Sequence, residues 1–426
     1  MIIGGDNTMF IVSLFLSTIS FALIINSCLK IPSINIFIAL NIFIAYLIRP
    51  ILIYLNNGTI LTSAEFNFEN YLYGYFASSL FLLFFTIGIC IGLKKPSNLS
   101  TLSINPTINT RYERMLLAAT FVFTAFYLFI GGFDVLFTNR SASISIVNPF
   151  VRYIYPFAVV CMFGAGVSIS LAMALGDFKK AGLKLVFLFL CSTAIGQRGF
   201  LIVAIIIGFG LGFDANKRKI LTSNNIYLGL LILVILFSKK IMTLLFSGGS
   251  NDVVEDDLMI KYLSSPDGDT TEVWMILMNY LVSNEFLFGN SIINNIFNLI
   301  PHTLRSVFGL LNGQDILNSY YAPDAYWEKG FGFNVTLPIE MYMNFGLLGA
   351  FPMLLVGILL GKVISNFYGA VAYNFKDPAH ESLKLYGCFA VLSSFAGFQW
   401  FIVFLVVYFV YKPNKNAKQV HMKARN

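Results

Sequence analysis

The sequence has few charged residues and few of the residue types that build soluble catalytic centres. Asp, Glu, Lys and Arg make up 12% of the 426 residues, and there are three histidines and five cysteines. The cysteines lie in apolar runs without a CxxC pair, which indicates packing residues rather than a disulfide framework. The sequence also lacks a GxxxxGK[ST] phosphate loop, an HExxH motif and a GxSxG motif. These absences argue against ATP hydrolysis, zinc-protease and serine-hydrolase chemistry, and we expect neither a metal nor a cofactor.

Apolar residues dominate what is present. They make up 57% of the chain, a composition typical of membrane proteins. The net charge of +7 does not indicate nucleic-acid binding, because the basic residues gather in short loops and the tail, where they encode membrane orientation. The first apolar run follows no basic region, so we expect a retained helix rather than a signal peptide.

The apolar runs predict an all-α, polytopic bundle of about 10–12 transmembrane helices, since a bilayer core takes about 20 helical residues. Predicted spans lie at 9–29, 33–55, 71–93, 115–131, 151–175, 181–195, 199–213, 223–247 and 338–361. The run 383–411 is either one tilted helix or two short ones around Gly397–Trp400. Basic loops at 94–114, 176–182 and 214–222 and the basic tail place these segments in the cytoplasm and the N-terminus outside.

The same pattern divides the chain into four parts. Transmembrane helices fill 1–246, a long hydrophilic segment at 247–337 lies outside, further transmembrane helices fill 338–411, and a basic tail at 412–426 lies in the cytoplasm. The external segment contains two predicted helices, Thr271–Leu281 and Ser291–Ile300. They either lie in the membrane interface or fold over the bundle. Long loops in compact proteins are usually functional.

Arg198 is the foremost candidate for a functional residue. The apolar stretch Ala181–Phe213 is too long for one crossing and short for two, which predicts a hairpin of two helices of about 15 residues each. Its turn, Gly196-Gln-Arg-Gly199, then lies below the outer membrane surface. A charge there is expensive, and a guanidinium suits phosphate. We therefore expect Arg198 to bind a lipid-linked phosphate.

Other external residues extend this hypothesis. A pyrophosphate needs more than one cation, and Arg140 and Arg305 are candidates, although either is equally readable as an interfacial anchor. His302 lies three residues before Arg305, on the same helical face, and is a candidate general base or a solvated loop histidine. Glu340 begins an apolar run, where it is a second candidate base or a first-turn acid that favours the helix dipole.

An aromatic stretch forms the last group. Tyr320, Tyr321, Asp324 and Trp327 suit glycan binding, because sugar rings stack on aromatic side chains; an interfacial aromatic belt is the alternative.

Three short motifs carry a resemblance to a known family. They are Gln197-Arg198-Gly199, the loop Pro301–Arg305, and the run Gly332–Gly349 that opens a late helix. In order and in topological place they resemble the Wzy-type O-antigen (oligosaccharide repeat-unit) polymerase family of bacterial inner membranes.

The resemblance implies a GT-C-like membrane glycosyltransferase whose active site faces the periplasm. Its substrates would be undecaprenyl-pyrophosphate-linked glycans, as donor and as acceptor, and pyrophosphate would be the leaving group. Arg198 and Arg305 would then neutralise the pyrophosphate, and His302 or Glu340 would be the base. Membrane lipids, a flippase and a chain-length regulator are the implied partners. An O-antigen ligase of the same architecture, a polysaccharide or lipid flippase-type transporter and a scaffolding membrane protein remain alternatives.

Overall fold

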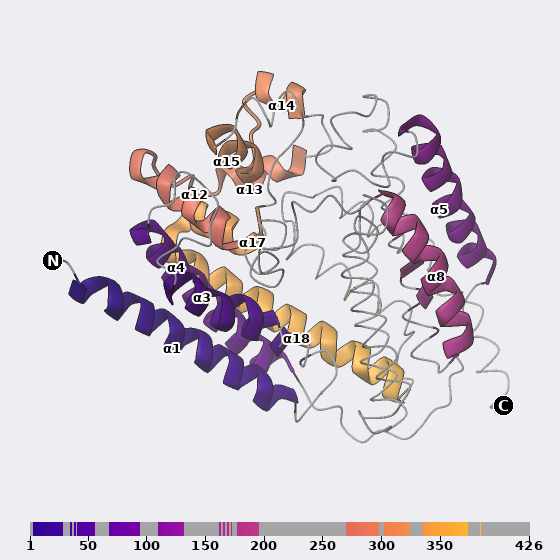
Figure 1. Cartoon of the computed structure of the whole chain (residues 1–426), viewed down its shortest axis with the longest axis horizontal. Helices are drawn as coiled ribbons and strands as arrows, with labels where there is room; N and C mark the ends of the chain where they lie inside the picture. The colour runs from indigo at the N-terminus through magenta and orange to yellow at the C-terminus, as the bar shows by residue number, and fades with distance from the viewer. Residues whose placement is uncertain are drawn as a thin grey trace, which may run out of the picture.

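The computed structural model of the chain describes residues 3–28, 41–55, 68–93, 110–131, 177–195, 270–297, 302–321 and 335–373, with isolated positions between them. Within these residues the chain is all-helical and contains no strand, which confirms the predicted helical class for this part of the chain (Figure 1).

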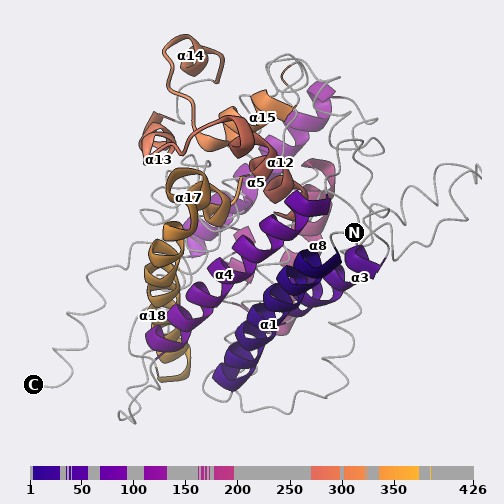
Figure 2. The ribbon, with the colours of Figure 1, turned by 90° about the vertical axis from the view of Figure 1, so that its left-hand side faces the viewer.

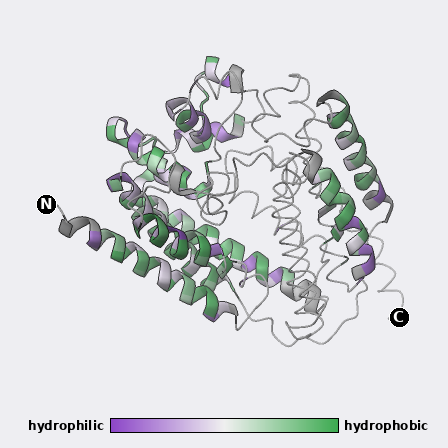
Figure 3. Cartoon of the chain, in the orientation of Figure 1, coloured by the Kyte–Doolittle hydropathy of each residue, from purple (hydrophilic) through white to green (hydrophobic). Residues whose placement is uncertain are grey.

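Three helical segments in the described part are long and apolar enough to cross a membrane. They are Asn7–Ser27, within α1 (Ile3–Cys28), all of α4 (Phe68–Gly92), and Leu337–Phe367, which combines α17 (Leu337–Phe345), a 3-10 turn (Gly346–Gly349) and most of α18 (Ala350–Tyr373). They correspond to the predicted spans 9–29, 71–93 and 338–361. Figure 3 shows that apolar residues cover most of α1, α4 and α18.

Shorter helices occupy three of the other predicted spans. The span 33–55 contains a π-helix (Phe43–Ile48) followed by α3 (Arg49–Leu55). The spans 115–131 and 181–195 correspond to α5 (Thr110–Gly131) and α8 (Phe178–Ile195). The predicted spans 151–175, 199–213, 223–247 and 383–411 lie outside the described residues, apart from isolated positions.

Small polar residues line the contact between α1 and α4. Ser13, Ser17 and Ser20 are fully buried although they belong to an apolar helix. The Ser17 hydroxyl pairs with that of Ser79 on α4 at 2.9 Å, and Ser13 and Ser20 donate to carbonyls of their own helix. Small side chains let two membrane helices approach closely, and their hydroxyls find partners without water.

A glycine seam, formed by Gly88, Gly92, Gly357 and Gly361, joins α4 to α18. A side chain added at Gly361 would place its Cβ 2.5 Å from the carbonyl oxygen of Ile89 and 3.0 Å from the Cα of Gly92. The two backbones therefore touch, and a residue with a Cβ would push the helices apart. The glycines are spaced four residues apart on both helices, as in close crossings of membrane helices.

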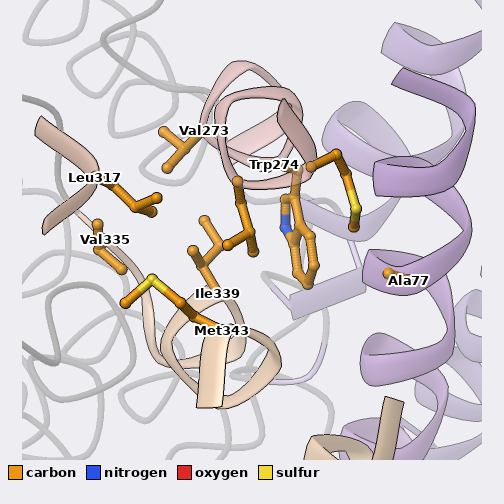
Figure 4. Close-up of a cluster of buried hydrophobic side chains, with 9 residues drawn as sticks. Ala77, Val273, Trp274, Leu317, Val335, Ile339 and Met343 are labelled. Carbon is orange, nitrogen blue, oxygen red and sulfur yellow. The ribbon is translucent and has the colours of Figure 1, made fainter. Parts of the chain in front are cut away.

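The described part of the predicted external segment packs on the N-terminal half of α4. Its helix α12 (Thr270–Ser283) confirms the predicted helix at 271–281 and folds over the bundle, since residues 273–278 are all buried. Figure 4 shows a cluster of apolar side chains from four helices: Ala77 on α4, Val273 and Trp274 on α12, Leu317 on α15 (Gly313–Tyr321), and Ile339 and Met343 on α17, together with Val335.

The remaining helices of this segment are short. They are α13 (Asn290–Asn294), a 3-10 turn (Asn295–Phe297) and α14 (His302–Val307). Of the helix predicted at Ser291–Ile300, the α-helix ends at Asn294 and a 3-10 turn continues to Phe297, while 298–300 lie outside the described residues. Asn294 and Asn295 donate to the Leu311 carbonyl and to Glu340. Figure 2 shows α12 to α15 and α17 gathered at one end of α1, α4 and α18.

Candidate functional site

A fully buried carboxylate lies where α17 meets the external segment. Glu340 occupies the first turn of α17, two residues after Pro338 and four residues after the N-cap Thr336, and its exposed fraction is 0%. One carboxylate oxygen, Oε1, accepts a hydrogen bond of 2.5 Å from the Ser291 hydroxyl and one of 3.3 Å from Asn295 Nδ2. The first-turn position favours a negative charge, but the buried partners on α13 and the following turn show that Glu340 does more than complement the helix dipole.

Asn344 connects this carboxylate to the backbone of the external segment. It lies one turn after Glu340, and its Nδ2 donates to Ser291 Oγ at 2.7 Å and to the Glu340 carbonyl at 2.8 Å. Its Oδ1 accepts from the Gly289 N–H at 2.9 Å. The hydroxyl of Ser291 thus accepts from Asn344 and donates to Glu340. This chain of buried bonds fixes the orientation of the carboxylate.

The second carboxylate oxygen is held differently. Glu340 Oε2 is buried and faces the backbone N–H of Gly313. Thr336 Oγ1, one turn earlier, is buried and has no hydrogen-bond partner among the described residues. Oε2 lies against the backbone of Gly313, where even a methyl group would overlap the carboxylate; its Cβ would be 2.8 Å from Glu340 Cδ.

Gly313 begins a helix whose first turn carries an ion pair. Asp315 accepts from both terminal nitrogens of Arg305, at 2.8 Å and 3.2 Å, and both side chains are buried. The Asn312 N–H also donates to Asp315, while the Asp315 N–H donates to Asn312 Oδ1 at 2.8 Å. This reciprocal pair has the geometry of a capping box at the start of α15.

Charge in this region is therefore partly balanced. Glu340 packs against Gly313, which begins the helix whose Asp315 binds Arg305, so two buried carboxylates and one guanidinium lie on neighbouring segments. The planar fork of Arg305 is bidentate to Asp315, an arrangement equally suited to phosphate. For Arg305 to bind an anionic substrate, the substrate would have to replace Asp315 or join the pair from outside.

The other predicted site residues fall into three groups, according to how much of each residue the structure describes. Tyr320 and Tyr321 are exposed at the end of α15, and the Tyr320 ring meets Tyr280 edge to face at a centroid distance of 5.4 Å. The backbone of His302 begins α14, but its side chain lies outside the description. Four predicted residues lie wholly outside the described part: Arg140, Arg198, Asp324 and Trp327.

The structure adds residues that the sequence analysis did not select. Ser291, Asn295, Asn312 and Asn344 are buried polar residues, and each bonds to Glu340, to Asp315 or to the segment that holds them. The pattern Asn312-x-x-Asp315 is a readable capping signal, whereas nothing local to Ser291 or Asn295 indicates a partner 45 to 49 residues away. In the described part, no three His, Cys, Asp or Glu side chains gather as metal ligands. Comparison of the chain with protein-family models, with curated proteins and with solved structures gives no match.

Proposed function

We propose that this chain is a membrane glycosyltransferase that polymerises undecaprenyl-pyrophosphate-linked oligosaccharide repeat units into O-antigen or a related surface polysaccharide. It would be a polytopic, GT-C-like protein of the bacterial inner membrane, with its active site at the periplasmic face. The observation that carries the proposal is the buried Glu340 carboxylate, with one oxygen fixed by Ser291 and Asn295 and the other against the backbone of Gly313.

The reaction needs only groups that a protein without a cofactor can supply. An acceptor hydroxyl attacks the anomeric carbon of the donor glycan, a new C–O bond forms, and the bond to the pyrophosphate breaks. The hydroxyl proton passes to a base, and undecaprenyl pyrophosphate leaves with the bonding electrons. Glu340 would be that base, with His302 as the second candidate.

The cationic residues would stabilise the leaving group. Arg198 would bind the pyrophosphate, supported by Arg305 and Arg140, because negative charge develops there as the bond breaks. In this scheme the ion pair with Asp315, in which Arg305 Nη1 lies 2.8 Å from Asp315 Oδ2, would orient the guanidinium before the diphosphate binds. Tyr320, Tyr321, Asp324 and Trp327 would contact the glycan.

The base assignment is tested by Glu340→Gln. Glutamine retains an acceptor for Ser291 and Asn295 but takes up no proton, so the fold should persist while the polysaccharide ladder disappears. Glu285, exposed in the same segment, gives the matched control, and Glu285→Gln should leave the ladder unchanged. His302→Ala is assayed in parallel. A normal ladder in both Glu340→Gln and His302→Ala cells would refute both base assignments.

The substrate assignment is tested by Arg198→Ala and by deletion. Arg198→Ala should abolish long-chain polysaccharide while the protein still inserts, and Arg198→Lys should be poor because the fork is lost. In a deletion strain the lipopolysaccharide should consist of core plus a single repeat unit. Bare core in that strain would instead identify a ligase.

A further inference from the structure

A short turn of the external segment, residues 286–289, is bound to the break between α17 and α18. The N–H groups of Leu287 and Phe288 donate to the carbonyls of Met343 and Asn344, each at 3.1 Å. The Gly289 N–H donates to Asn344 Oδ1 at 2.9 Å. The ring of Phe286 faces Gly346, whose φ of 57° ends α17. The turn is therefore fixed to the break by main-chain bonds.

The break lies inside an apolar segment that is too long for one straight crossing. Leu337–Phe367 contains 31 residues, which as a continuous helix would extend roughly 46 Å against a hydrocarbon core of about 30 Å. Where a helix breaks near lipid, its last carbonyls need donors, because the surroundings supply no water. The turn 286–289 supplies two of them at the end of α17.

The outer surface of the turn is apolar. Phe288 has a φ of 48°, a backbone conformation rare for a bulky residue, and its side chain is 79% exposed. Leu348, just beyond the break that the turn caps, is 70% exposed. Below it, a row of exposed apolar side chains continues along one face of α18: Phe351, Leu355 and Leu359. The row follows helical spacing and belongs to a candidate membrane span, so it faces lipid.

Polar residues mark the upper limit of this surface. Ser283, Asn284 and Glu285, which precede the turn, are exposed, and so is Asn290, which follows it. An exposed aromatic side chain between polar neighbours, on a turn bonded to the break where a lipid-facing row begins, is the arrangement found at the boundary between headgroups and acyl chains.

We propose that the turn 286–289 is a membrane contact: Phe288 inserts among the lipid acyl chains of the leaflet at the α17 end, and Glu285 remains in the headgroup or water layer. The occupant of this surface is bilayer lipid, not a protein. The inference depends on the span Leu337–Phe367 being in a membrane and requires no catalytic role for the chain.

The test uses the otherwise native full-length chain in cells. The photoreactive amino acid benzoyl-phenylalanine is introduced at one position in each of three variants. It replaces Phe288 in the first, Leu348 in the second as the lipid-facing reference, and Glu285 in the third as the water-facing control. Irradiated protein is purified, and lipid adducts are measured by mass spectrometry. We expect adducts at 288 to approach those at 348 and to exceed those at 285 by about tenfold, because burial of a phenylalanine ring in apolar surroundings favours it by that factor or more.

Two results would overturn the proposal. One is a lipid adduct at 348 without one at 288. The other is a protein adduct at 288, whether to a second copy of this chain or to another protein. The variant Phe288→Leu keeps an apolar side chain at the turn and should insert normally, whereas Phe288→Asp should lower the amount of correctly inserted protein; equal amounts of the two would also count against a membrane contact.

Discussion

The glycine seam between α4 and α18 predicts that a single methyl group will strongly destabilise this protein. Gly361→Ala places a Cβ 2.5 Å from the Ile89 carbonyl oxygen and 3.0 Å from Gly92. An ordinary contact needs 3.4 Å or more, so the methyl group is short of room by about 1 Å. The opposing atoms belong to the backbone of another helix, and no side chain can rotate to make space.

The expected loss follows from this geometry. Adding a methylene to a close-packed interior costs about 1–3 kcal/mol. We expect the upper end, about 3 kcal/mol, because relief requires the two helices to separate along the seam. That loss changes the ratio of folded to unfolded protein by about 100-fold.

Gly182→Ala is the matched control. Gly182 lies in α8, and a Cβ there would meet no atom of the described residues within 4 Å. Removing the backbone freedom of glycine at an open helical position should stabilise the protein by about 0.5–1 kcal/mol. Both variants are unfolded reversibly in mixed micelles with increasing SDS and followed by circular dichroism. The reasoning fails if Gly361→Ala is no less stable than Gly182→Ala.

Three further predictions concern buried groups. Trp274→Ala should cost about 3–5 kcal/mol, because the indole is 1% exposed in the cluster of Figure 4. Arg305→Met should cost about 3–5 kcal/mol by leaving Asp315 as a buried, uncompensated charge, and adding Asp315→Leu should restore much of that loss. Gly313→Ala should cost about 1–3 kcal/mol through its overlap with Glu340, and far less when combined with Glu340→Ala.

The same unfolding measurement checks all three, with the second and third read as double-mutant cycles. A Trp274→Ala loss below about 1 kcal/mol would mean that the cluster collapses to fill the space. An additive effect of the Arg305 and Asp315 substitutions would show that the two side chains do not depend on each other. Equal losses from Gly313→Ala with and without Glu340 would place the carboxylate elsewhere.

The sequence predicted the elements whose signal is local. The apolar runs predicted both ends of α4, the end of α1 and the start of α17 to within three residues, and the spacing of apolar residues predicted α12. They missed the end of α18, which continues to Tyr373 rather than ending at 361. The break after α17 was not predicted, although the sequence contains Gly346 and Gly349 at this place. The φ of 57° at Gly346 depends on the turn 286–289 that packs on it, and that packing is not visible in the sequence. The four-residue spacing of the glycines on α4 and α18 is visible in the sequence. The sequence does not show that these glycines join α4 to α18.

The candidate site follows the same division. Glu340 was selectable as a carboxylate inside an apolar run, and Arg305 as an external arginine. Their partners were not, because Ser291 lies 49 residues from Glu340 and the ion pair of Arg305 with Asp315 depends on the folding of α14 against α15. Long-range polar bonds leave no periodicity in the sequence, so only the fold reveals them.

The two sides of the glycine seam are synthesised at different times. α4 is complete at Gly92, but its partner α18 starts at Ala350, and the ribosome needs on the order of tens of seconds to translate the residues between them. During that interval Gly88 and Gly92 of α4 are not yet covered by α18, and another helix could pack against them. Chains truncated before Ala350 should therefore keep this surface of α4 uncovered in the membrane, where quality-control proteases can recognise it.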